Sequence, residues 1–325
     1  MTDTTLLSQP TPSTSATRVD AYTLVRFSGK DTRDFLQRVL TQDVMHLGSR
    51  NALAGYCDPK GRLLDTMRLW LEGDEGVLAL MPADNSEALI KRLRMFVLRD
   101  DVTLTVLNAD YRVVALLDHA ADKLSAMGVA LPAEGEVAHT SYGDVLRLED
   151  ATPLPEANIG NVRVLLVIPQ ATALPFDVTE MTALFLTSEL AAGIPSVWAA
   201  TNGRFVPQAT NLDLVNGVSF TKGCYPGQEV VSRMKHIGKP SRRMFLAKTV
   251  GGVLPMAGDP VFAGNDEVGA VVLATRIANV TYVLYSLLLS AADADLAVGE
   301  TEKAPLEKLA LPYTIESVSY THLRA

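Results

Sequence analysis

The chain has 325 residues, of which 48% are hydrophobic and 20% charged, values typical of a folded globular protein and not of a disordered one. Its 29 Lys and Arg against 37 Asp and Glu give a formal net charge of −8, so a dedicated nucleic-acid-binding domain, which is usually basic, is not expected. Cys57 and Cys224 are too few for a disulfide framework or for an iron–sulfur cluster held by this chain alone. The five histidines show no metal-ligand spacing, so no built-in metal site is expected either.

The two ends of the chain are set apart from the predicted fold. Residues 1–20 are rich in Ser, Thr and Pro, lack the pattern of a secretory signal, and are expected to form a disordered tail. Residues 318–325, VSYTHLRA, resemble a translated sequencing adaptor and are left out of the fold prediction. The most apolar stretch, 280–298, is broken by Asp293 and Asp295 and is too short to span a bilayer. We therefore expect a cytoplasmic protein that has no membrane partner.

The first two thirds of the chain alternate between strand-like and helix-like patterns. Residues 21–29 alternate as a strand does, and residues 30–44 then carry an apolar stripe at helical spacing. Strands are predicted at 21–29, 51–57, 62–71, 76–81, 102–107, 111–117, 144–149 and 162–168, and helices at 30–44, 83–98, 120–127 and 177–193.

A hairpin turn lies between the second and third of these strands. Asp58, Pro59 and Gly61 occupy the first, second and fourth positions that suit a type I turn. On physical grounds alone, a good turn is sufficient reason for these residues. Cys57, at the end of the preceding strand, is expected to be a core residue.

The pattern changes after residue 243 to short apolar runs separated by Gly and Pro. Such runs at regular spacing predict a small β-barrel or sandwich. We therefore predict an α+β region at 21–240, made of two subdomains at about 21–105 and 106–240, and a β-barrel at 241–317.

The stretch KGCYPGQEVVSR, residues 222–233, contains the second cysteine between glycines. Gln228 and Glu229 are expected to open a helix whose first position is Pro226, which places Cys224 just before a helix N-terminus and beside Lys222. Both features lower the pKa of a thiol from its usual value of about 8.5 and make it more reactive. The alternative is a small buried residue in a tight loop. The flanking glycines and lysine favour the reactive thiol.

The segment FVPQATNLDLVNGVSFTKGCYPGQEVVSR, residues 205–233, resembles the signature of the YgfZ family, folate-binding relatives of the glycine-cleavage T-protein (GcvT). The family hallmark is Lys-Gly-Cys-Tyr-x-Gly-Gln-Glu with an Arg four residues later. PQATNL at 207–212, AGIP at 192–195 and an Asp-x-Lys-Gly-Arg hairpin also match, and the resemblance extends over residues 21–317. The matching positions are Lys222, Gly223, Cys224, Tyr225, Gly227, Gln228, Glu229 and Arg233 in the hallmark, and Asp58, Lys60, Gly61 and Arg62 in the hairpin.

The resemblance implies an α+β fold, a GcvT/YgfZ-like ring of α+β subdomains around a central folate channel with a C-terminal β-barrel. It implies tetrahydrofolate, or a one-carbon derivative, as the cofactor. It also implies a role in the assembly or repair of iron–sulfur enzymes, including radical-SAM tRNA methylthiotransferases. Folate and these client enzymes are the expected partners, with no direct nucleic-acid contact. Cys224 and Lys222 would be the catalytic residues, with Gln208, Asn211, Tyr225, Gln228, Glu229, Arg233, Lys60 and Arg62 contacting the folate.

Some of these residues have a simpler interpretation. Arg233 and Glu229 are four residues apart and would pair on one helix face, independently of any ligand. Lys60 and Arg62 belong to the turn, and they would meet the glutamate tail of a folate only if they face the channel.

Two positions depart from the T-protein pattern. The aspartate that is catalytic there aligns with Ala88, beside Glu87 and one turn after Asp84. A glutamate suited to the pterin aligns with Ala191, and the nearest carboxylate, Glu189, would lie on another helix face. We therefore expect a protein that is not a conventional enzyme. A folate-dependent aminomethyltransferase of the T-protein type is the alternative, and an interaction scaffold with a vestigial channel is a third hypothesis.

Overall fold

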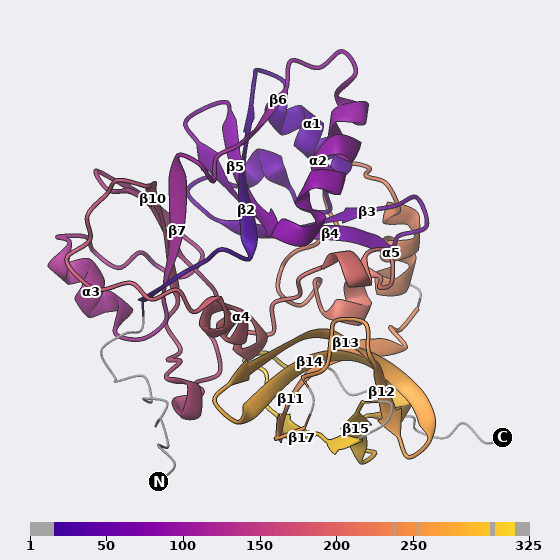
Figure 1. The fold of residues 1–325 in the computed structure, drawn as a ribbon. Coiled ribbons are helices and arrows are strands. Elements are labelled where there is room, and N and C mark those ends of the chain that lie inside the picture. Colours follow the sequence, from indigo (N-terminus) through magenta and orange to yellow (C-terminus); the bar gives the residue numbers. More distant parts are fainter. Residues whose placement is uncertain (1–15, 237, 253, 300–302, 316–325) are drawn as a thin grey trace, which may run out of the picture.

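The computed structural model describes residues 16–236, 238–252, 254–299 and 303–315, which form two sheet-based subdomains above a C-terminal barrel (Figure 1). The predicted adaptor-derived segment at 318–325 lies outside the described residues, as do residues 1–15 of the predicted tail. Within the described part of the chain, no helix is long and apolar enough to cross a membrane.

The first subdomain is an antiparallel sheet of five strands in the order β3-β4-β5-β2-β6. Apolar side chains of α1 and α2 pack with those of the sheet into one core, which includes Phe35, Leu36 and Leu93. The elements are β2 (Tyr22–Ser28), α1 (Thr32–Val39), β3 (Ala52–Cys57), β4 (Leu63–Glu72), β5 (Gly76–Pro82), α2 (Ala83–Val97) and β6 (Thr103–Val106).

The second subdomain is another five-stranded sheet, in the order β1-β7-β10-β9-β8. Its elements are β1 (Ala16–Arg18), β7 (Tyr111–Leu116), α3 (Ala120–Ala126), β8 (Val137–Thr140), β9 (Gly143–Arg147), β10 (Val164–Pro169) and α4 (Thr182–Ala191). The prediction of a disordered tail was wrong for its last part, because residues 16–18 pair with β7 and so complete the sheet edge. Strand β8 was missed by the sequence pattern.

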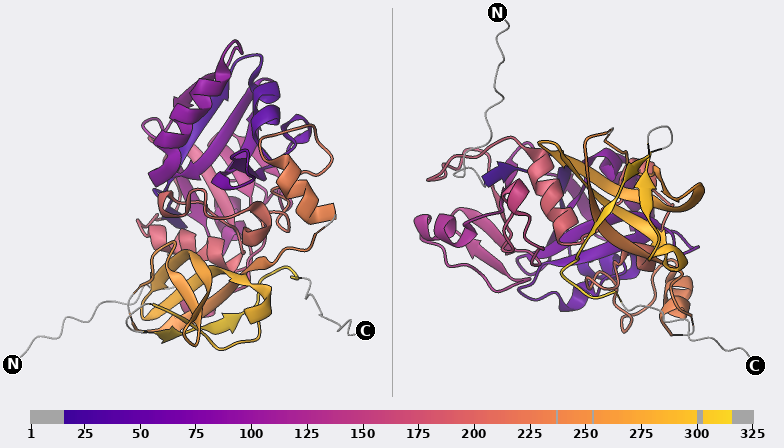
Figure 2. Two further views of the ribbon diagram at one scale, coloured as in Figure 1. Left: turned by 90° about the vertical axis from the view of Figure 1, so that its right-hand side faces the viewer. Right: turned by 90° about the horizontal axis from the view of Figure 1, so that it is seen from below.

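The C-terminal domain is a nearly closed barrel of seven strands with its own apolar core. Helix α4 lies against it, and Thr187 on that helix shares a hydrogen bond of 2.8 Å with Thr275 on β13. Figure 2 shows the barrel from two further sides, beneath both subdomains. Its strands are β11 (Arg242–Val250), β12 (Pro260–Ala263), β13 (Asp266–Ile277), β14 (Val280–Leu288), β15 (Leu296–Val298), β16 (Ala304–Pro305) and β17 (Glu307–Leu309).

The first helix is shorter than its apolar stripe predicted. It ends at Val39, and Leu40 turns to an extended conformation that bridges to Tyr56 on β3. Thr41 then donates a 2.6 Å hydrogen bond to the carbonyl of Gly217 and accepts one from Gly55. These partners are distant in sequence, so tertiary contacts override the local helical pattern here.

Candidate functional site

The cysteine motif and the hairpin motif, about 160 residues apart in sequence, pack against each other. The predicted turn forms, with the amide of Gly61 donating to the carbonyl of Asp58 at 2.9 Å. Gly227 lies directly on this turn: a Cβ there would be 2.5 Å from the Asp58 carbonyl oxygen and 2.6 Å from the Gly61 Cα. Only a glycine fits, and the two signature motifs therefore form one structural unit.

The chain at 225–228 forms a second turn, which changes where the helix begins. The amide of Gln228 donates to the carbonyl of Tyr225 at 3.2 Å, and Gly227 has φ +81°. Pro at the second position and a left-handed Gly at the third define a type II turn. Helix α5 (Gln228–His236) starts after it. The prediction that Pro226 opens the helix was therefore wrong, because the left-handed Gly227 separates Pro226 from the helix.

Lys222 anchors the motif to the first subdomain. Its side chain is buried, and its Nζ donates to the carbonyls of Gln37 at 2.5 Å, Leu40 at 2.7 Å and Gln42 at 2.9 Å, where α1 ends. Burial lowers the pKa of Lys222 to about 8, against an opposing influence of Asp43. All three N–H donors of the ammonium are used by these carbonyls. Lys222 therefore positions the loop, and among the described residues its Nζ makes no hydrogen bond to Cys224.

The two cysteines occupy opposite environments. Cys224 is exposed, and a Cβ at its neighbour Gly223 would meet nothing within 4 Å. Tyr225, on its other side, is buried beneath the Lys222 ammonium, which lies 5.5 Å from the ring centroid. Cys57 is buried at the end of β3, as expected, and burial raises the pKa of its thiol to about 12. The structure thus presents one thiol to solvent from a loop whose flanking side chains are fixed.

The remaining motif side chains divide into exposed and buried groups. Lys60, Glu229 and Arg233 are exposed, and Gln228 is half-buried. No ion pair joins Arg233 to Glu229 in the described residues. The roles predicted for these residues as folate contacts therefore stay predictions.

Gln208 and Asn211 connect the motif region to other elements. Gln208 is buried, and its Nε2 donates to the carbonyl of Val231 in α5 at 2.7 Å. Asn211 is fully buried and pairs with the backbone of Met244 on β11, donating to its carbonyl at 2.7 Å and accepting from its amide at 3.1 Å. Its amide also reaches the Tyr313 hydroxyl at 3.3 Å. Both amide hydrogens of Asn211 and one lone pair of its oxygen are used in these bonds, and its role as a folate contact stays a prediction.

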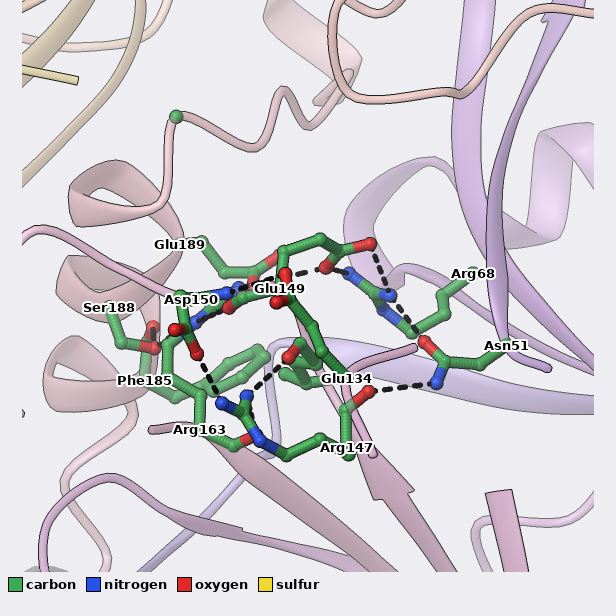
Figure 3. Close-up of polar contacts among 12 residues, drawn as sticks. Asn51, Arg68, Glu134, Arg147, Glu149, Asp150, Arg163, Phe185, Ser188 and Glu189 are labelled. Atoms are coloured by element: carbon green, nitrogen blue, oxygen red, sulfur yellow. Dashed lines mark hydrogen bonds and ion pairs between the residues drawn. The ribbon is translucent and has the colours of Figure 1, made fainter. Parts of the chain in front are cut away.

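A chain of charged side chains lies at the centre, where the two subdomains and α4 meet (Figure 3). Arg68 on β4 binds Glu149 through two hydrogen bonds, of 3.1 and 2.7 Å, and donates to Asn51 at 2.6 Å. Arg163 donates to Glu189 on α4 at 2.5 Å and to the backbone carbonyl of Glu149 at 3.0 Å. We call Arg68, Glu149, Arg163 and Glu189 the central network.

The central network holds buried charges in balanced pairs. Burial alone would raise the pKa of Glu149, but the charge and hydrogen bonds of Arg68 outweigh it and lower that pKa. Burial would likewise lower the pKa of Arg68, and Glu149 reverses this effect and raises it. Arg68 and Glu149 thus stabilise each other in their charged forms, and Arg163 and Glu189 form a second buried ion pair beside them.

The central network lies between an inner cavity and an outer cleft. The inner cavity has a volume of about 20 Å³ and is lined by Tyr22, Thr66, Arg68, Phe185, Glu189 and Ser196, among others. The outer cleft, of about 450 Å³, is lined by Asn51, Leu53 and Glu149, and Leu53 also borders the inner cavity. A cavity of 20 Å³ holds about one water molecule.

At the two positions that depart from the T-protein pattern, the structure places a carboxylate in the inner cavity in one case and none in the other. Glu189, which helical spacing had placed on another face, lines the inner cavity, while Ala191 is buried in the core. Ala88 and Glu87 are both exposed on α2. Asp84 instead accepts a 3.1 Å hydrogen bond from the amide of Ala199. Arg68, Glu149 and Arg163 were not found from the sequence, since isolated charged residues in strands and loops carry no motif.

Comparisons with known proteins agree with this architecture. No family model matches the chain. The chain is 29% identical over 311 residues to the tRNA-modifying protein YgfZ of Serratia proteamaculans (strain 568), covering 91% of this chain and 92% of that protein. It is also 29% identical over 310 residues to the tRNA-modifying protein YgfZ of Pectobacterium carotovorum subsp. carotovorum (strain PC1), covering 91% of both.

A solved structure shares the fold. The crystal structure of glycine cleavage system aminomethyltransferase T from Bartonella henselae superposes with a TM-score of 0.72 at 14% sequence identity, covering 91% of this chain and 85% of that one. The predicted α+β fold of the T-protein kind, with its C-terminal barrel, is therefore confirmed.

Proposed function

Since this chain is a homologue of the YgfZ proteins and has the T-protein fold, we propose that it is a folate-binding factor that maintains iron–sulfur enzymes. In this proposal it binds tetrahydrofolate in the cytoplasm and supports the assembly or repair of client enzymes, tRNA methylthiotransferases among them. Cys224 is its reactive thiol. The effect on tRNA, which the names of its relatives record, would arise through these clients.

The observation that supports this function best is the presentation of Cys224. The thiol is exposed, while the chain on both sides of it is held in place. Lys222 binds three backbone carbonyls, Tyr225 is buried, and Gly227 packs against the hairpin. A thiol held at a defined place on the surface can approach a partner protein without an ordering cost in the loop. Buried Cys57 has no such access.

The inner cavity suits a pterin in its chemistry but not in its volume. The chemistry of the inner cavity suits a pterin, since Glu189 offers a carboxylate for ring N–H groups and Tyr22 and Phe185 offer aromatic surfaces. Its volume of about 20 Å³ does not accommodate one. Binding there would require the side chains around the Arg163–Glu189 pair to rearrange, with the outer cleft as the open approach.

The thiol proposal is tested by comparing the two cysteines. We expect native protein to be alkylated at Cys224 about a thousandfold or more faster than at Cys57, because Cys57 reacts only after opening of a core worth about 5 kcal/mol or more. In cells lacking the endogenous protein, Cys224→Ala should lose methylthiolated tRNA while Cys57→Ala, the matched control, retains it. Full rescue by Cys224→Ala would overturn the role of the thiol.

The alternative function, an aminomethyltransferase of the T-protein type, is distinguished from the maintenance factor by an activity assay. It requires glycine-dependent formation of methylenetetrahydrofolate with a lipoyl partner, and the exposed Ala88 offers no carboxylate for that reaction. Calorimetry with tetrahydrofolate distinguishes the remaining hypothesis. Binding without turnover favours the maintenance factor, and no binding of any reduced folate favours a scaffold with a vestigial channel.

A further inference from the structure

A second cavity, separate from the central one, lies where α5, the hairpin turn and the barrel meet. Its volume is about 420 Å³, and it shares no lining residue with the inner cavity or the outer cleft. Figure 1 shows α5 beside the end of β3 and β4 and above the barrel. We call this space the arginine cavity, because Arg62, Arg204 and Arg242 line it.

The three guanidinium groups are held in place mainly by neutral partners. Arg62 Nη1 donates to the carbonyl of Arg204 at 2.9 Å, Arg204 Nη1 to the carbonyl of Gly258, and Arg242 Nη1 to that of Val268 at 3.0 Å. A carbonyl orients a guanidinium without cancelling its charge, and each group keeps further N–H donors. The arginines are thus arranged in advance and remain positively charged.

The charge balance of the arginine cavity favours a dianion. Among the described residues that line it, Glu267 is the one acidic side chain, and it is largely exposed, with Oε1 3.9 Å from Arg204 Nη2. Three guanidinium groups and one carboxylate leave two positive charges in a protein whose overall charge is −8. A phosphomonoester supplies about two negative charges and three oxygen acceptors, whereas a single carboxylate supplies one charge and two acceptors.

The other walls of the cavity suit an organic group larger than phosphate. Phe205, Met234 and Pro240 provide apolar surface next to the arginines. Gln208 also lines the cavity, and although its Nε2 is bonded to α5, its buried Oε1 has no hydrogen-bond partner in the described residues. A buried acceptor without a partner costs about 1–3 kcal/mol, which an N–H donor of a ligand would relieve.

From these features we propose that the arginine cavity binds an organic phosphomonoester of nucleotide size. The phosphate lies against Arg62, Arg204 and Arg242, and an amino group of the base donates to Gln208 Oε1. This site is spatially separate from the inner cavity of the folate proposal, because the central network takes no part in it. A competing occupant is the glutamate tail of a folate, which had been assigned to Arg62 from the sequence.

The experiment is calorimetric titration of the full chain with AMP, with inorganic phosphate and with tri-γ-glutamate. We expect AMP to bind more tightly than phosphate, and Arg204→Gln and Arg242→Gln each to weaken AMP by about tenfold or more, the effect of losing a charge-assisted hydrogen bond. Arg276→Gln is the matched control, since Arg276 also donates to backbone carbonyls on the barrel but lies outside the cavity. It should bind AMP as the wild type does.

Folding of each variant is checked by its thermal unfolding midpoint. If Arg242→Gln does not fold, Arg242→Lys keeps the charge without the planar fork and should show a smaller loss of affinity. Competition by a 5′-phosphorylated RNA trinucleotide distinguishes the source of the phosphate: displacement of AMP indicates an RNA end, and no displacement indicates a free nucleotide. The proposal is overturned if millimolar AMP does not bind, if the variants bind it unchanged, or if tri-γ-glutamate binds and AMP does not.

Discussion

The central network and the loop at residues 222–227, which we call the Cys224 loop, differ in the partners that surround their buried charges. In the network, each guanidinium meets a carboxylate, Arg68 with Glu149 and Arg163 with Glu189. In the loop, the ammonium of Lys222 is surrounded by three carbonyl oxygens, and no ion pair joins it to a carboxylate in the described residues. Pairing raises the pKa of Arg68 and lowers that of Glu149, which favours the charged form of both, whereas burial lowers the pKa of Lys222 and disfavours its charged form.

The two regions also differ in whether the site beside them is closed or open to solvent. The network joins both subdomains to α4 and leaves an inner cavity of only about 20 Å³. Around the Cys224 loop, Lys222 joins the end of α1 to the motif, and Gly227 joins the motif to the hairpin, which leaves the thiol exposed. One region closes the interior, and the other holds a reactive group open.

The largest effect is expected from breaking the network. Arg163→Met removes a fully buried cation and leaves the Glu189 carboxylate without its partner. Removing one member of a buried pair costs about 3–5 kcal/mol, and we expect this loss in the free energy of unfolding measured in urea.

Two comparisons control this prediction. Arg276→Met removes a partly exposed arginine that donates to Thr281 and to backbone carbonyls, and it should cost about 1 kcal/mol. The double variant Arg163→Met/Glu189→Gln should recover part of the stability, because the amide is not charged. An unfolding midpoint of Arg163→Met equal to that of the wild type would refute the structural role of the pair.

Much of the fold followed from the sequence because its signals were local. The hairpin turn was predicted from Asp58, Pro59 and Gly61, and the turn hydrogen bond is present. Regularly spaced apolar runs predicted the barrel, and seven strands form it. Alternation and helical periodicity are readable within about ten residues, which explains this success.

The site was predicted less well because its contacts connect distant segments. Lys222 was expected to activate its neighbour, yet it binds carbonyls about 180 residues earlier in the chain. Arg68 and Glu149 pair across the subdomain junction without any motif in either segment. The turn at Pro226-Gly227 is different, since Pro-Gly is itself a type II turn signal and the sequence contained enough to recognise it.

In the Cys224 loop, substitution of Gly227 is expected to disturb the structure most. In Gly227→Ala the new Cβ would lie 2.5 Å from the carbonyl oxygen of Asp58, and the backbone has φ +81°. Close packing and the left-handed backbone together should lower the free energy of unfolding by about 2–3 kcal/mol. Alkylation of Cys224 should also change in rate, because the turn that positions it must shift.

Gly223→Ala is the matched control for this variant. It lies next to Cys224, but its Cβ would meet no atom within 4 Å, so the free energy of unfolding should change by less than about 0.5 kcal/mol. Equal losses in the two variants would show that the contact of the motif with the hairpin does not depend on Gly227.

The smallest effect is expected from the pH dependence of the stability that Lys222 contributes. The pKa of Lys222 is lowered from 10.5 to about 8 in the folded protein, so the unfolded chain holds more protons between these values. Stability then rises with pH in this window, by up to about 1.4 kcal/mol per unit. We expect the unfolding free energy of the wild type, minus that of Lys222→Met, to increase from pH 7.5 to 9.5, since the other titrating groups cancel.

The same difference taken with the double variant Arg163→Met/Glu189→Gln should stay flat over this range. Arginine remains protonated at these pH values, and this variant also replaces the carboxylate that would otherwise be left without its partner, so no group remains there to bind or release a proton. A flat profile for Lys222→Met would mean that the carbonyl oxygens stabilise the ammonium as well as a carboxylate would. The two regions would then differ in geometry alone and not in how they hold charge.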